Sequence, residues 1–174
     1  MNKSDNAAAV RAVPSILCVA VLIFLDQLTK HLAVLHLKGK DSFVLIPQVL
    51  EFRYLENRGA AFSLFQNQQV FFYILTGAFL VFAVIVIRKM PALHRYLPLK
   101  ICILVLIAGA CGNLIDRIIH KYVVDFIYFS LIDFPIFNAA DIYVTLSVTA
   151  LILLVIFKYK EEDFTFLKRR TEHE

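Results

Sequence analysis

Four long apolar runs constrain this chain more than any other feature. Residues 70–87, 101–115 and 142–157 contain no charged side chain, and a fourth run begins at Ala12 and meets Asp26 and Lys30 before it reaches Leu37. About 20 helical residues are needed to cross the roughly 30 Å hydrocarbon core of a bilayer. With 60% hydrophobic residues, 18% charged residues and a mean hydropathy of +0.72, the sequence predicts an all-α membrane protein. We expect four transmembrane helices in one integral membrane domain that comprises residues 1–174.

The basic residues predict how these helices are oriented. The N-terminal tail, the stretch 88–100 and the C-terminal end together hold 11 of the 18 lysines and arginines. Because cytoplasmic loops are enriched in lysine and arginine, both termini are expected in the cytoplasm, with residues 38–67 and 118–137 on the outer face. Lys3 and Arg11 precede apolar residues as in a secretory signal peptide, but no cleavage site of small residues follows before Asp26. The first helix is therefore expected to be retained.

The segments outside the helices differ in character. Residues 41–65, DSFVLIPQVLEFRYLENRGAAFSLF, combine β-branched and aromatic residues with Pro47 and Gly59, which predicts short strands. We expect the apolar side of this segment to rest on the bilayer surface. In residues 118–137, Pro135 is expected to interrupt regular structure before the last helix. The charged C-terminal residues 161–174 are expected to be a solvated end.

Histidine and cysteine spacing argues against a metal site. None of the five histidines has the HExxH spacing of a metalloprotease. Cys18, Cys102 and Cys111 lie in apolar runs and show neither CxxC spacing nor a nearby histidine. We therefore expect three buried free thiols, no metal and no cofactor.

Three acidic residues near helix ends are predicted to lie at one depth in the membrane. Asp26, Asp116 and Asp141 lie roughly 22 to 25 Å along their helices from the basic residues at the other end, at 1.5 Å per residue. An ionisable side chain inside a membrane costs about 2.5 to 3.5 kcal/mol on insertion scales, so acids at a common depth predict a shared polar cavity. The alternative is that these residues are interfacial anchors.

Residues on the same helices provide partners for these acids. Asp26 and Lys30 are spaced i to i+4, so they share a helix face and can pair; direct contact with a substrate is the alternative role. Asn113, Asp116 and Arg117 share one face of the third helix by their three- and four-residue spacing. Because Arg117 cannot lose its charge, we expect it to pair with Asp116.

The stretch FNAAD, residues 137–141, predicts a helix start that carries an acid. Asn138 is expected to be the N-cap, which puts Asp141 at the third helical position, where a carboxylate suits the helix dipole. A capping role alone is the alternative reading of Asp141. Asp125, in VVDFI, is a second acid expected near the outer membrane surface. Two acids can share one proton and activate water for amide hydrolysis, with one as base and the other polarising the carbonyl.

Five motifs in order carry a resemblance to a known family. These are DQLTK at 26–30, ENRGAAFS at 56–63, GNLIDR at 112–117, VVDFI at 123–127 and FNAAD at 137–141. With these motifs the chain resembles the bacterial lipoprotein signal peptidases, or signal peptidase II, which are aspartic intramembrane proteases. The resemblance implies an endopeptidase that removes signal peptides from prolipoproteins after a diacylglyceryl group has been added to a cysteine. It implies cleavage on the N-terminal side of that cysteine.

The resemblance also implies roles for individual residues. The catalytic dyad would be Asp125 and Asp141. The positions that match the family's supporting residues are Asp26, Lys30, Asn57, Gly59, Gly109, Asn113, Asp116, Arg117, Asn138 and Ala140. One departure is Ala108, where the family commonly has glycine; with Gly112 it still forms a small-xxx-small pattern that permits close helix packing. The implied partners are diacylglyceryl-modified prolipoproteins and membrane lipid, with no nucleic acid, in the bacterial cytoplasmic (inner) membrane.

A small ion or proton carrier is the strongest rival of a different class. In such a protein the aspartates would form a relay across the membrane. This reading predicts no peptide cleavage, and it gives no role to the apolar outer segment or to the asparagine-containing motifs.

Overall fold

Four long helices form the membrane part of the protein. The computed structural model describes residues 3–59 and 68–167. The helices are α1 (Lys3–Leu37), α2 (Gln69–Lys89), α3 (Leu97–His120) and α4 (Ala139–Phe157). All four contain a stretch long and apolar enough to cross a membrane, and only a minority of the side chains in these stretches are buried inside the protein. The four predicted spans are confirmed.

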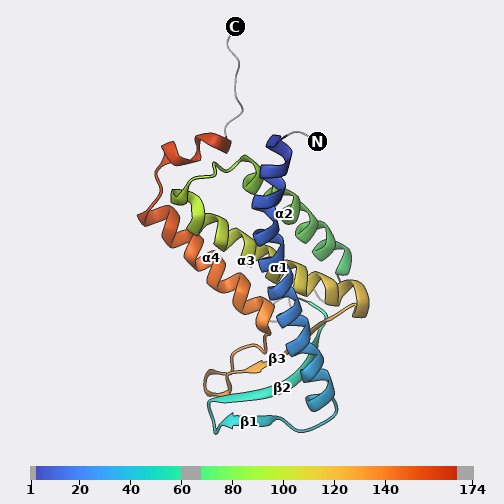
Figure 1. Cartoon of the computed structure of the whole chain (residues 1–174). Coiled ribbons are helices and arrows are strands. Elements are labelled where there is room, and N and C mark those ends of the chain that lie inside the picture. Colours follow the sequence, from blue (N-terminus) through green and yellow to red (C-terminus); the bar gives the residue numbers. More distant parts are fainter. Residues whose placement is uncertain (1–2, 60–67, 168–174) are drawn as a thin grey trace.

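Helix α3 is the centre of the helical part. Helices α1, α2 and α4 each pack on α3, and α4 makes the most extensive of these contacts (Figure 1). Apolar side chains such as Ile74, Leu146 and Phe157 point outward and are well exposed. A helix that exposes apolar side chains all along its outer face suits lipid rather than water.

A three-stranded antiparallel sheet lies at one end of the helices, opposite the N-terminus of α1 (Figure 1). Its order is β1 (Phe43–Ile46), β2 (Leu50–Asn57) and β3 (Val123–Tyr128). Strands β1 and β2 confirm the predicted strand character of residues 41–57. Residues 60–65 of that segment, with the AAFS part of its motif, lie outside the described residues. Strand β3 was not predicted.

The sheet is fixed to the end of α1 by a small apolar cluster. Ala33 and Leu37 of α1 pack against Val124 and Phe126 of β3. Because side chains alternate across a strand, the residue between Val124 and Phe126 points to the opposite face. That residue is Asp125, which is thus directed away from α1.

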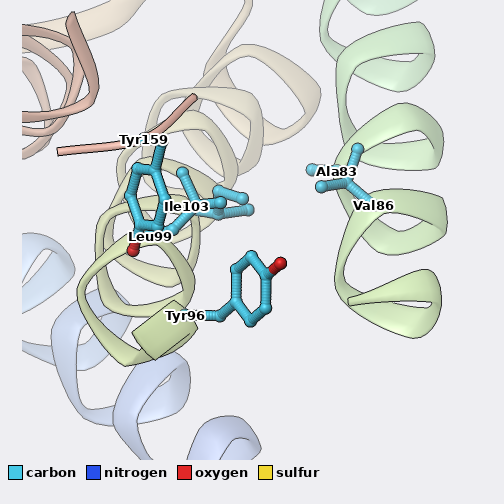
Figure 2. Packing of buried hydrophobic residues seen from close by; sticks show 6 residues of the cluster. All are labelled: Ala83, Val86, Tyr96, Leu99, Ile103 and Tyr159. Carbon is cyan, nitrogen blue, oxygen red and sulfur yellow. The ribbon is translucent and has the colours of Figure 1, made fainter. Parts of the chain in front are cut away.

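A second core closes the other end of the helices. It contains the buried residues Ala83, Val86, Tyr96, Leu99, Ile103 and Tyr159. Figure 2 shows the last four gathered together, with Ala83 and Val86 of α2 facing them. Two short 3₁₀ helices, η2 (His94–Tyr96) and η4 (Glu161–Leu167), border this core, and a third, η3 (Ser130–Ile132), follows β3.

Two expectations about side chains were wrong. Residues 161–167 are not a free solvated end, because Phe164 and Phe166 pack on the second core and Asp163 pairs with Arg95 at 2.6 Å. Residues 168–174 lie outside the described residues. Cys18 is exposed on α1 and the other two cysteines are only partly buried, although all three are free thiols. In a membrane, an apolar run does not require burial inside the protein, since lipid covers it.

Candidate active site

The first turn of α4 holds Asp141 in a fixed orientation. Asn138 has an extended backbone and accepts a hydrogen bond through its side chain from the backbone N–H of Asp141, at 3.1 Å. In return, Asp141 Oδ2 accepts from the backbone N–H of Asn138, also at 3.1 Å. This reciprocal arrangement is a capping box. The predicted N-cap at Asn138 is confirmed.

Asp125 is held by two amide side chains. Its Oδ1 accepts a hydrogen bond from Asn138 Nδ2 at 2.6 Å, and its Oδ2 accepts one from Asn57 Nδ2 at 2.8 Å. The residue is 1% exposed. Leu55 of β2 lies opposite Asp125 in the sheet, and Asn57 lies near the end of the same strand. Strand pairing therefore places the amide of Asn57 beside the carboxyl group of Asp125.

The two carboxyl groups share their surroundings. Asn138 contacts both of them, and Asn113 Nδ2 donates to Asp141 Oδ1 at 2.8 Å. Asn113 Oδ1 in turn accepts from Asn138 Nδ2 at 3.2 Å. Asp125 and Asp141 line one cavity of about 480 Å³, whose other walls include apolar residues of α4 and of the segment 134–137. The site thus has a polar floor and largely apolar walls.

Burial and, secondarily, the charge of Asp141 raise the pKa of Asp125 from its usual 3.8 to about 7. The hydrogen bonds from Asn57 and Asn138 act in the opposite direction, because they stabilise the carboxylate. Near neutral pH, Asp125 is therefore available both as an acid and as a carboxylate. Two neighbouring acids of this kind can hold one proton between them.

A buried ion network supports the two elements that carry these acids. Lys30 Nζ lies 2.9 Å from Asp26 Oδ2 and 3.1 Å from Asp116 Oδ2. Asp26 Oδ1 accepts from the backbone N–H of Ala140 at 3.0 Å, and Asp116 Oδ2 accepts from that of Val124 at 3.0 Å. The predicted pairing of Asp26 with Lys30 is confirmed. One carboxylate of the network holds the start of α4, and the other holds the start of β3.

Two glycines let α3 approach its neighbours closely. A Cβ atom on Gly109 would lie 2.7 Å from the backbone oxygen of Ala140 and 2.9 Å from Val144 Cγ2. A Cβ atom on Gly112 would collide with the carboxyl group of Asp26. Ala108, which is fully buried, fits without a glycine at that position. The close packing predicted for this part of α3 is present.

Arg117 does not pair with Asp116, so that prediction was wrong. Asp116 faces α1, where it contacts Lys30, whereas Arg117 Nη2 donates to the backbone oxygen of Gly59 at 3.2 Å. Its guanidinium also lies over the ring of Phe72, 4.4 Å from the ring centre. Consecutive residues on an α-helix point about 100° apart, so adjacent residues reach different neighbours.

Gly59 completes the set of predicted residues at the site. Its backbone N–H donates to Asn57 Oδ1 at 3.0 Å, and its backbone oxygen accepts from Arg117. Arg117 is thereby linked through Gly59 and Asn57 to Asp125. All twelve residues singled out from the sequence lie in this site or in direct contact with it.

Two contacting residues were missed. Gln27 Nε2 donates to Asp116 Oδ1 at 2.9 Å and to the backbone oxygen of Gly112 at 3.2 Å. Its place beside Asp26 in DQLTK was the available signal. Phe72 carried no signal, because it is one of many aromatic residues in an apolar run. Among the side chains that the structure describes, those of residues 13–59 and 68–167, no group of three or more His, Cys, Asp or Glu is arranged to hold a metal ion.

Known proteins resemble this chain over most of its length. Residues 18–157 match the family model for signal peptidase (SPase) II. Lipoprotein signal peptidases of Streptococcus pyogenes serotype M5 (strain Manfredo) and serotype M18 (strain MGAS8232) are each 40% identical over 149 residues. Each alignment covers 86% of this chain and 95% of the relative.

Two solved structures share the fold of this chain over most of its length. One, described as a bacterial membrane enzyme at 2.3 Å resolution, is 34% identical with a TM-score of 0.72, covering 92% of this chain and 94% of its own. A second, at 1.9 Å resolution, is also 34% identical with a TM-score of 0.71. This alignment covers 84% of the present chain and 94% of the solved one. The resemblance found in the five sequence motifs is confirmed. Since sequence and structure agree over most of both chains, this protein belongs to the signal peptidase II family.

Proposed function

We propose that this protein is an aspartic endopeptidase that removes the signal peptide from prolipoproteins whose cysteine carries a diacylglyceryl group. Cleavage occurs on the N-terminal side of that cysteine, at the outer face of the bacterial cytoplasmic membrane. The observation that carries the proposal is a pair of carboxyl groups, the buried Asp125 and the half-buried Asp141, on the wall of one cavity at the sheet end of the helices. Membership of the signal peptidase II family supports the same activity.

In the proposed reaction, Asp141 is the base and Asp125 holds the shared proton. Asp141 accepts two hydrogen bonds, from Asn113 and from the backbone of Asn138, and the N-terminal dipole of α4 also stabilises a carboxylate there. Asp141 removes a proton from water as the water oxygen attacks the scissile carbonyl carbon. Asp125 gives its proton to the carbonyl oxygen, which yields a tetrahedral diol.

The diol then collapses to products. Asp125, now ionised, takes a proton back from one hydroxyl group of the diol as the C=O bond re-forms. Asp141 delivers the proton it holds to the peptide nitrogen as the C–N bond breaks, and the lipidated cysteine leaves with a free amino group. Asp141 returns to the carboxylate and Asp125 to the acid, so the dyad is ready for another turnover. The reaction consumes one water molecule and requires neither a metal nor a cofactor.

The apolar walls of the cavity suit the end of a signal helix. Ile142, Val144 and Leu146 of α4 line it together with Phe134 and Phe137. The exposed apolar strand β1 lies at the same end of the molecule and suits the bilayer surface (Figure 1). Two acyl chains in the outer leaflet would hold the modified cysteine at the depth of the dyad, since each buried methylene contributes about 0.8 kcal/mol to anchoring. Both termini are then in the cytoplasm, as the distribution of basic residues predicts.

The direct test compares two forms of one prolipoprotein at equal concentration with the purified protein in lipid. The lipidated precursor is expected to be shortened, and the unlipidated form to be cut far more slowly. No shortening of either form, together with proton flux into protein-containing vesicles, would favour the proton carrier. Equal rates on both forms would contradict lipid positioning and leave the dyad standing.

A further inference from the structure

A large apolar cavity lies far from the dyad, at the other end of the helices. Its volume is about 970 Å³, and it opens between α1 and α2 over α3. Helices α1 and α2 each pack on α3 far more than on each other, and side chains of all three helices line the groove. Its apolar lining includes Ile16, Val19, Ile23, Val84, Ile87 and Ile107. The groove faces the hydrocarbon of the membrane and has the character of an acyl-chain site.

Two basic side chains stand at one end of this groove. Arg88, at the end of α2, and Lys100, near the start of α3, both line the cavity, and Lys100 is half-buried. Neither side chain forms an ion pair with any residue among 13–59 and 68–167. The cavity lining contains no acidic residue. Two cations that have no ion-pair partner among these described residues therefore lie at one end of an apolar groove.

We propose that this groove binds one anionic phospholipid. An acyl chain lies between α1 and α2, and the phosphate contacts Arg88 and Lys100. Basic pockets between transmembrane helices are typical sites for anionic headgroups. The lining contains neither an acidic nor an aromatic side chain that could receive an ammonium group, so a glycerol headgroup fits better than choline. The bound lipid bridges α1 and α2, which pack only weakly on each other.

The test is native mass spectrometry of the full-length protein, purified in detergent. It is titrated with phosphatidylglycerol and, separately, with phosphatidylcholine of the same acyl chains. We expect one phosphatidylglycerol to bind about tenfold more tightly than phosphatidylcholine, because two basic side chains contact its phosphate without competition. The double variant Arg88→Gln with Lys100→Gln is expected to lose this preference. Lys89→Gln is the matched control, since Lys89 is exposed on the same turn of α2 and does not line the cavity.

A second variant tests the acyl chain independently of the charges. Ala20 lines the groove on α1, so Ala20→Phe is expected to fill it and to weaken phosphatidylglycerol binding while leaving the melting temperature of the lipid-free protein unchanged. Equal binding of the two lipids to the wild type would overturn the proposal, as would an equal loss in Lys89→Gln. Binding of inorganic phosphate with the affinity of the lipid would show a free-anion site and would also overturn it. None of these results bears on peptide cleavage, because the dyad lies at the opposite end.

Discussion

At the scale of the residue, Asn138 connects the two acids. Its side-chain oxygen caps α4, its amide nitrogen donates to Asp125, and its backbone N–H donates to Asp141. The side chain is fully buried. One asparagine thus fixes both carboxyl groups and the start of the helix that carries one of them.

Replacing Asn138 is expected to affect folding and turnover through separate bonds. Asn138→Ala loses the cap and the donor to Asp125, so we expect stability to fall by about 1 kcal/mol and turnover to fall sharply. Asn138→Ser retains a capping oxygen but lacks the amide, so it is expected to recover the melting temperature without recovering turnover. Thermal unfolding and cleavage assays on both variants measure the two effects. Full turnover in Asn138→Ser would show that the dyad does not require this amide.

The pH profile reports the protonation of Asp125. Because Asp125 carries the shared proton in the proposed reaction, kcat/KM is expected to fall as the pH rises through the pKa of about 7. Asn57 stabilises the carboxylate, so Asn57→Ala is expected to raise this pKa and to move the alkaline limb to higher pH. In the wild type, the rise in the pKa of Asp125 from 3.8 to about 7 on folding stabilises the folded protein at pH values below about 4. This contribution to the free energy of unfolding is lost as the pH rises from about 4 through 7. A limb that stays in place or moves to lower pH in Asn57→Ala would contradict the assignment.

Sequence reasoning was strongest where a local rule applies. The cap at Asn138 follows from adjacent residues, and the pair of Asp26 and Lys30 follows from the spacing of one helical turn. The partner of Arg117 could not be found in this way, because it depends on which element lies against each side of α3. Two of its contacts, Gly59 and Phe72, come from the segment after β2 and from α2.

At the scale of the element, the contact of α3 with α4 decides whether the site assembles. Gly109→Ala is expected to push these helices apart, because its Cβ would lie 2.7 Å from the backbone oxygen of Ala140. We expect a lower melting temperature and lower turnover. Gly77→Ala on α2 is the matched control, since nothing lies within 4 Å of its Cβ, and it is expected to be neutral or slightly stabilising. If Gly109→Ala behaved like the control, the helices would have room that the structure does not show.

The elements themselves were predictable to different degrees. Apolar runs identified all four helices, and β-branched residues with Pro47 indicated β1 and β2. Strand β3 was missed, although VVDFI has the composition of a strand, because its partner β2 is distant in the sequence. The short helix η4 was missed because its charges obscured Phe164 and Phe166, which pack on the core.

At the scale of the whole molecule, Arg117 joins the membrane helices to the end of the molecule that carries the three-stranded sheet. It extends from α3 to Gly59, just beyond β2, and to Phe72 of α2. Arg117→Ala is expected to lower stability by about 1.5 to 3 kcal/mol, the usual range for a hydrogen bond to a charged group, and to lower turnover. Arg58→Ala is the control, because Arg58 is adjacent to Gly59 but is exposed. An unchanged melting temperature in Arg117→Ala would show that the contacts of Arg117 with Gly59 and Phe72 do not stabilise the fold.

The proposed function depends on Asp125 and Asp141 acting together in the cleavage. The most direct measurement is the turnover of a lipidated prolipoprotein by purified Asp125→Asn and Asp141→Asn, with Asp133→Asn as an exposed control near the cavity. Size-exclusion profiles and melting temperatures establish that each variant is folded. We predict that the turnover of each dyad variant falls by about 10²- to 10⁴-fold, the usual contribution of a general acid or base. Asp133→Asn is expected to cleave at the wild-type rate. Substantial cleavage by either folded dyad variant would contradict the account.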